Sequence, residues 1–265
     1  MVTQNGRMAV ENPNQQIVDR LLIGNRDAFI DVSEESSTAV WPLGARLQIG
    51  ERVYRYAENG GTGLATARLC QMPVIETNGD VTDMAVDTPA IGALQMEVTN
   101  GGNTAITEDE FVGGWLHVND DTGEGYLYQI RANDAMGTSA AGTVYLYDPV
   151  VIALGASATV SLTHGMWANT IIHPSPNTAA LTGVTPGVIT AEYFFWIQTW
   201  GPAIVLHDGS TAVTQGDPVI VSEDDDGAVT LLDRDASGRD EPEVGWAMHP
   251  NADGEHTLVY LRLHP

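Results

Sequence analysis

The residues best placed to do chemistry form one short acidic motif late in the chain. Asp233, Asp235 and Ser237 alternate with other residues and precede Gly238, the spacing with which an EF-hand loop begins to ligate calcium. The twelfth position of such a loop needs a glutamate, but Val244 stands there, and no helical pattern flanks the motif. The spacing therefore predicts a solvated acidic turn, with Asp233, Asp235 and Ser237 as candidate ligands for a weakly bound structural cation.

A second acidic stretch covers residues 223–226 and ends at Gly227. We interpret it either as a charged turn or as one half of a diffuse cation site. No other cofactor is expected.

The remaining side chains with catalytic potential have no recognisable spacing. Seven histidines are scattered without a zinc-binding pattern, and neither a Gly-x-Ser-x-Gly elbow nor a Cys–His signature around Cys70 is present. No glycine-rich phosphate loop follows a strand and opens a helix. With thirty-five acids, some carboxylates will lie close together by chance, so they give no specific evidence for a glycosidase pair. These residues therefore indicate no specific reaction, and a glycosidase pair stays open.

Charge is the strongest feature of the composition. Thirty-five acidic residues face eleven basic ones, all arginines, giving a formal net charge of −24 over 265 residues. Such a surface repels nucleic acids and anionic membranes, so neither is an expected partner. No apolar run reaches the roughly 18 residues of a membrane span, and the first residues lack a signal-peptide pattern. Acid-rich, lysine-free composition is similar to that of proteins from extreme halophiles; the alternative is an acidic surface encoded by a GC-rich genome.

Short alternating stretches separated by turn residues predict an all-β fold. Glycine, asparagine and aspartate lie between them, as at 58–61, 78–80 and 100–103. The expected strands before residue 150 are 47–49, 52–57, 67–74, 81–86, 91–99, 111–118, 125–130 and 144–147; those near the end are 228–232, 244–248 and 256–263.

The most apolar stretch spans residues 188–221. One face of its first strand carries Tyr193, Phe195 and Ile197, and the other carries Phe194, Trp196 and Trp200. A strand that is apolar on both faces must be covered on both, so we place it in the middle of a sandwich or barrel. We expect this strand to end at Gly201 and Pro202 and a new one to begin at residue 203, because proline donates no hydrogen bond to a ladder.

These patterns predict two β-sandwich or barrel units preceded by an extended N-terminal arm. The arm covers residues 1–45, the first β domain 46–163 and the second, small β-barrel 188–265. Three prolines in residues 164–187 indicate a crossing loop between the two units.

The arm is polar except for one cluster at helical spacing, Ile17, Val18, Leu21, Leu22 and Ile23. Burial of so short an apolar segment does not offset the entropy lost when the arm becomes ordered. We therefore expect the arm to become ordered on a partner.

Several motifs occur in an order that resembles a known family. They are Gly-Val-Ile-Thr at 187–190, Gln-Thr-Trp-Gly-Pro at 198–202, Gly-Asp-Pro-Val at 216–219, Asp-Gly-Ala-Val at 226–229 and Val-Gly-Trp-Ala at 244–247. With the last strand, they resemble the small β-barrel of head decoration (cement) proteins from tailed viruses. Arg-Tyr-Ala at 55–57, and Gly-Gly-Trp at 113–115 before Gly-Tyr at 125–126, are similar to virion structural proteins. The resemblance covers residues 46–263 and is densest after residue 184.

This resemblance implies a structural protein of the virion without catalysis. Its expected partner is the major capsid protein, on the outer surface of an icosahedral head, and it implies a homo-oligomer, most often a trimer. Ile17, Val18, Leu21, Leu22 and Ile23 would then form a capsid-binding arm. Two alternatives stay open: a tail or baseplate protein, and a carbohydrate-binding β-sandwich module or hydrolase in which Trp115, Tyr126 and Tyr128 stack on sugars.

Overall fold

The computed structural model describes residues 30–75, 81–102, 104–209, 212–232, 241–249 and 254–265, which form strands and no helix. The predicted all-β fold is confirmed. In these residues no helix is long and apolar enough to cross a membrane. The strands are β1 (Arg46–Ile49), β2 (Arg52–Glu58), β3 (Leu69–Gln71), β4 (Met84–Val86), β5 (Gln95–Thr99), β6 (Trp115–Asp120), β7 (Leu127–Asn133), β8 (Ala141–Leu146), β9 (Thr159–Thr163), β10 (Ile171–Ile172), β11 (Leu181–Val184), β12 (Phe194–His207), β13 (Pro218–Val221), β14 (Ala228–Leu231), β15 (Glu243–His249) and β16 (His256–Arg262).

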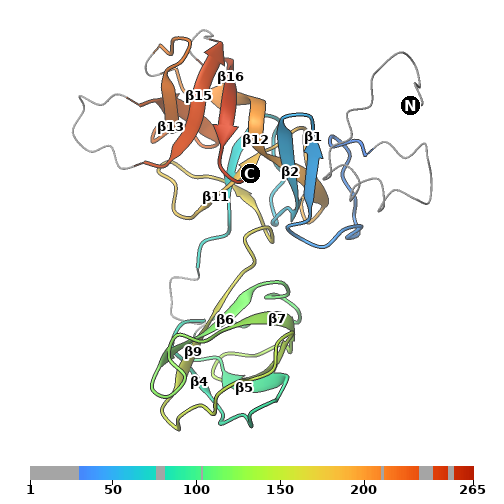
Figure 1. The fold of residues 1–265 in the computed structure, drawn as a ribbon, viewed down its shortest axis with the longest axis vertical. Helices are drawn as coiled ribbons and strands as arrows, with labels where there is room; N and C mark the ends of the chain where they lie inside the picture. The colour runs from blue at the N-terminus through green and yellow to red at the C-terminus, as the bar shows by residue number, and fades with distance from the viewer. Residues whose placement is uncertain (1–29, 76–80, 103, 210–211, 233–240, 250–253) are drawn as a thin grey trace, which may run out of the picture. The chain divides into compact units, whose positions relative to one another are not determined.

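Strands β4 to β9 curl into a closed antiparallel barrel (Figure 1). Its order is β4-β5-β8-β7-β6-β9, and the pairing of β4 with β9 closes the circle. Closure leaves no strand edge unpaired in this unit, which removes a common route to aggregation.

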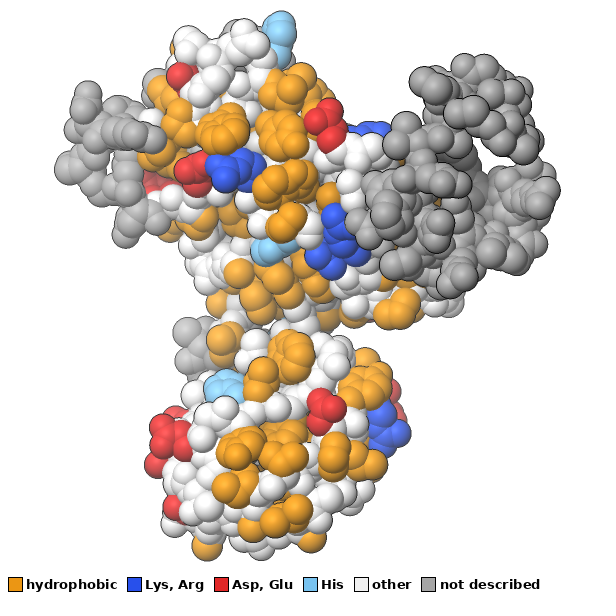
Figure 2. All heavy atoms as spheres, viewed as in Figure 1, with side chains coloured by type: hydrophobic (Ala, Val, Ile, Leu, Met, Phe, Trp, Pro, Cys, Tyr) orange, Lys and Arg blue, Asp and Glu red, His pale blue; other side chains and the backbone are white. Residues whose placement is uncertain are grey.

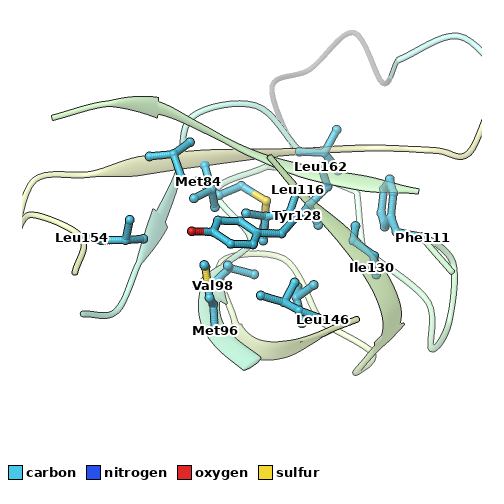
Figure 3. Packing of buried hydrophobic residues seen from close by; sticks show 14 of the residues in the cluster. Met84, Met96, Val98, Phe111, Leu116, Tyr128, Ile130, Leu146, Leu154 and Leu162 are labelled. Atoms are coloured by element: carbon cyan, nitrogen blue, oxygen red, sulfur yellow. The ribbon is translucent and has the colours of Figure 1, made fainter. Parts of the chain in front are cut away.

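The period-2 pattern of these strands builds the interior of the barrel. In β6, Leu116 and Val118 point inward and are buried, whereas Trp115 and His117 point outward. Figure 3 shows the Tyr128 ring among the methionine and leucine side chains of this core. Its hydroxyl accepts the Val151 N–H at 3.4 Å, which satisfies the polar tip of a buried tyrosine.

The other described strands form one ten-stranded sheet in which β12 is central. The first half of β12 pairs with β2 and β11, and the second half pairs with β16 and β14. Phe195 and Ile197 are fully buried. Burying each such side chain contributes about 1.5–3 kcal/mol, which explains why this stretch is the most apolar in the sequence.

Five strands of this sheet form a second closed circuit, β12-β16-β15-β13-β14 and back to β12. All pairs are antiparallel except the last, in which Leu206 of β12 lies beside Ala228 of β14. Small β-branched side chains fill the interior, including Val205, Val219 and Val259. The two predicted barrel or sandwich units are therefore both present.

The prediction that β12 ends at Gly201 is wrong, because the strand continues to His207. Gly201 has φ of +83°, and the register shifts between Gln198 and Trp200, so the strand bends there without ending. The pairing with β2 ends at Trp200, and that with β14 begins only at Leu206. Pro202 lies between these two ladders, where a missing N–H is tolerated.

The strand pairing follows a different division from the predicted domain ranges. β2 pairs with β12, and β3 pairs with both β10 and β11, so residues on either side of 81–163 share one sheet. The first barrel is thus an insertion between β3 and β10. Two short strands, β10 and β11, lie within the predicted crossing loop.

The predicted arm is described only from residue 30 onward. Ser36 forms a bridge with Phe194, and the rings of Trp41 and Trp196 are 6.3 Å apart. The Val40 N–H donates to the Tyr56 hydroxyl at 3.2 Å. Residues 36–41 therefore pack on β2 and β12 of the same chain.

Candidate functional site

The outer face of the second barrel is unusually apolar. In β16, Val259 and Leu261 fill the interior, yet the outward residues Leu258 and Tyr260 are also apolar. The same holds for the outward residues of β12 and β15. We call the following group the outer patch: Pro202, Ile204, Trp246, Met248, Leu258 and Tyr260.

Strand register brings the outer patch together. Tyr260 lies opposite both Pro202 and Trp246, and Leu258 lies opposite Ile204. Directly opposed residues on one face of a sheet are about 5 Å apart, so these side chains form one surface. Figure 2 shows hydrophobic side chains gathered over β12, β15 and β16. Ile204 is 47% exposed and Trp246 44%.

One charged pair borders the outer patch. The Arg262 guanidinium lies over the Trp246 ring, 4.5 Å from its centroid, and 3.8 Å from the Glu243 carboxylate. An exposed ion pair of this kind contributes little to stability. Its effect is local: Arg262 fixes the orientation of the Trp246 ring and neutralises one acid at the rim.

A cleft of about 1120 Å³ lies within residues 33–265. Most proteins bind small molecules in clefts of roughly this size, about 300–1,000 Å³. Its walls combine aromatic rings with carboxylates. The aromatic residues are Trp41, Trp115, Tyr147, Trp167 and Phe194, and the acidic ones are Glu58, Asp109 and Glu110.

The backbone holds Glu58 and Trp167 beside each other in this cleft. The Glu58 N–H donates to the Trp167 carbonyl at 2.8 Å, and the Trp167 ring packs edge-on against His264, with centroids 5.4 Å apart. Burial raises the pKa of the Glu58 carboxyl above its ordinary value, and the negative charge of Glu192 raises it further. The Glu58 carboxyl therefore keeps its proton to a higher pH than an ordinary glutamate does.

Comparison of the chain with protein-family models, with curated proteins and with solved structures finds no match.

The residues predicted as ligands or anchors lie outside the described part of the chain. This applies to Asp233, Asp235 and Ser237 of the acidic motif and to Ile17, Val18, Leu21, Leu22 and Ile23 of the arm. Among the described residues, no group of three or more histidine, cysteine, aspartate or glutamate side chains is arranged to hold a metal ion.

The acidic stretch 223–226 is described, and it forms a hydrogen-bonded turn. The Ser222 hydroxyl oxygen accepts the N–H groups of Asp224 and Asp225 at 3.0 and 3.1 Å and donates to Asp208. The Asp226 carboxylate accepts the Ser175 N–H at 2.9 Å. These contacts are those of the charged turn that the sequence allowed.

The three aromatic residues suggested for sugar stacking do not form one surface. Tyr128 is a core residue, because its position in β7 points into the barrel. Trp115 and Tyr126 are exposed, but Trp115 lies opposite Gln129. Its aromatic partner in that row is Tyr147, which the sequence did not indicate.

The outer patch was also missed, although β16 carries a signal for it. Both faces of this strand carry apolar residues, Leu258 and Tyr260 on one and Val259 and Leu261 on the other. Such a pattern indicates a strand that is covered on both faces. What the sequence did not provide is the register that joins these residues to β12 and β15.

Proposed function

We propose that this chain is a non-enzymatic structural protein of a virion that binds the outer surface of an icosahedral head and stabilises it. The outer patch is the observation that carries the proposal. A contiguous exposed apolar surface on a rigid barrel is typical of a protein–protein contact. A tail or baseplate protein would use the same surface. Electron cryo-microscopy of the particles distinguishes the two positions.

The outer patch differs in charge from the rest of this acidic protein. With a net charge of −24, most of the surface repels another acidic protein, whereas the six residues of the outer patch are uncharged and the Arg262–Glu243 pair lies at its rim. Depletion of charge at the centre of a contact and polar residues around it are the usual anatomy of an interface.

The proposed partner is the major capsid protein, and the proposed assembly is a homotrimer on the local threefold axes of the shell. Most homo-oligomers are closed and symmetric, so that every subunit makes the same contacts with its neighbours. The resemblance of residues 46–263 to decoration proteins supports this arrangement.

Rebinding to particles tests the proposal. Particles stripped of the chain are incubated with the purified protein in molar salt, and bound protein is measured after sedimentation. Ile204→Asp and Trp246→Ser should bind at least about tenfold more weakly, because interface centres carry most of the binding energy. Val188→Asp is the matched control, since Val188 is 72% exposed and lies outside the outer patch. Equal binding by all three variants would contradict a role for the outer patch.

The same assay tests the predicted capsid-binding arm. Because residues 36–41 pack on β2 and β12, the deletion should remove residues 1–29 and not extend to residue 40. The shortened protein should keep its thermal midpoint and lose most of its affinity for particles. Undiminished affinity would show that the arm is not an anchor.

A further inference from the structure

Three residues form a row across the outside of the first barrel. Trp115 of β6 lies opposite Gln129 of β7, and the Tyr147 N–H, just beyond β8, donates to the Gln129 carbonyl at 3.0 Å. Neighbouring strands are separated by about 4.8 Å, so the two aromatic residues stand roughly 10 Å apart with the glutamine between them. We call Trp115, Gln129 and Tyr147 the aromatic row.

The barrel does not need these side chains for its core. Trp115 is 40% exposed and Tyr147 is 56% exposed, whereas the alternate residues Leu116 and Leu146 are buried. In the described part of the chain, the Gln129 side-chain amide makes no hydrogen bond, so two donors and one acceptor face outward.

An acidic turn extends the same surface. Asp109 and Glu110 line the cleft together with all three residues of the aromatic row. The Glu110 carboxylate is occupied, because it accepts both the N–H and the hydroxyl of Thr107 at 2.7 and 3.0 Å. Among the described residues, no hydrogen bond reaches the Asp109 carboxylate, which is available as an acceptor.

We propose that the aromatic row, with Asp109, is a binding site for a neutral oligosaccharide. The two exposed rings present flat apolar faces on which sugar rings stack, and the Gln129 amide and Asp109 carboxylate match the donor and acceptor capacity of hydroxyl groups. Acidic or sulfated sugars do not fit, because the site carries carboxylates in a chain of net charge −24.

The arrangement also discriminates against organic cations. Quaternary ammonium groups are held by aromatic residues that surround them on several sides. Trp115 and Tyr147 instead lie side by side on one face of a sheet, two strands apart. This site adds a glycan-binding activity to the structural role proposed above and does not depend on it.

Calorimetric titration of the full chain in molar sodium chloride tests the site. The probes are neutral oligosaccharides of β-linked glucose, mannose and N-acetylglucosamine, with choline as a cationic probe and a sulfated glucan as an anionic one. We expect saturable binding of at least one neutral oligosaccharide and none of choline or the sulfated glucan.

Substitutions then locate the binding. Trp115→Ala and Tyr147→Ala should each weaken binding by about tenfold or more, as loss of a stacked ring does. Gln129→Ala should weaken it less. Tyr126→Ala is the matched control, because Tyr126 is an exposed aromatic residue of the same barrel outside the row. Thermal melts verify that each variant is folded. Any of three results would overturn the proposal. These are no binding of any neutral oligosaccharide, binding of choline that is tighter than that of every neutral oligosaccharide, and equal affinity of Trp115→Ala and the wild type.

Discussion

Individual residues show where the fold accepts an energetic cost. Glu58 is half-buried in β2, and both desolvation and the charge of Glu192 raise the pKa of its carboxyl. The folded protein therefore binds this proton more tightly than the unfolded chain does. The resulting stabilisation is present at acid pH and is lost as the pH rises through the folded-state pKa. At neutral pH the ionised Glu58 opposes folding.

Replacing Glu58 by glutamine should consequently raise the thermal midpoint at pH 7. The gain should shrink as the pH falls from the folded-state pKa of Glu58 toward the ordinary pKa of a glutamate, below which Glu58 is protonated in both the folded and the unfolded state. Glu51→Gln removes the same charge from an exposed turn and controls for relief of general repulsion. Equal gains for the two substitutions, or a gain for Glu58→Gln that grows in acid, would contradict the role of burial.

Cys70 is the other residue whose burial changes its chemistry. Its side chain is fully buried, and burial raises the pKa of the thiol well above its ordinary value. The thiol therefore stays uncharged, and Cys70 of β3 packs like a small apolar residue in the core beside Phe195 and Ile197.

At the level of elements, β12 joins the two halves of the ten-stranded sheet. It pairs with β2 and β11 in one half and with β14 and β16 in the other, so one strand belongs both to the larger sheet and to the closed circuit. The bend at Gly201 makes this possible. A Cβ atom at Gly201 would lie 2.5 Å from the Glu51 carbonyl oxygen, and the residue has φ of +83°.

Gly201→Ala should therefore lower the free energy of unfolding by about 2 kcal/mol or more, through backbone strain and the clash with residue 51. Gly61→Ala is the matched control, since a Cβ at Gly61 meets no atom within 4 Å. Urea denaturation of both variants measures the difference. A Gly201→Ala protein as stable as Gly61→Ala would show that β12 does not depend on this bend.

Strand-level features were predictable from the sequence to the extent that they are local. Alternation and turn residues located most strands, because each strand buries one face and each turn needs its own residue types. The pairing of β3 with β10 was not predictable, because about one hundred residues, which include the inserted barrel, separate Cys70 from Ile172. The outer patch depends on such a pairing, that of β12 with β16. The aromatic row joins strands that follow one another in the sequence, and Trp115 was named from the sequence, but the register was needed to place Gln129 and Tyr147 beside it.

Over the whole molecule, charge is the dominant property. A net charge of −24 disfavours a compact state, since the acids repel one another over a Debye length of about 10 Å at 0.1 M salt and only about 3 Å at 1 M. This is the physical basis of the predicted adaptation to high salt.

The thermal midpoint should accordingly rise by many degrees between 0.1 M and molar sodium or potassium chloride. Sucrose at matched osmolality controls for solvent exclusion, which stabilises compact states without screening charge. A midpoint that does not change with salt, or that changes equally with sucrose, would contradict the prediction.

The central claim is that the chain lies on the outside of a viral head and is held there through the outer patch. Electron cryo-microscopy of purified particles of the proposed virus is the most direct test. We expect density for both barrels on the outer surface of the head, with Ile204 and Trp246 buried against the shell or a neighbouring copy. Particles without the chain, or with the outer patch facing solvent, would contradict the account.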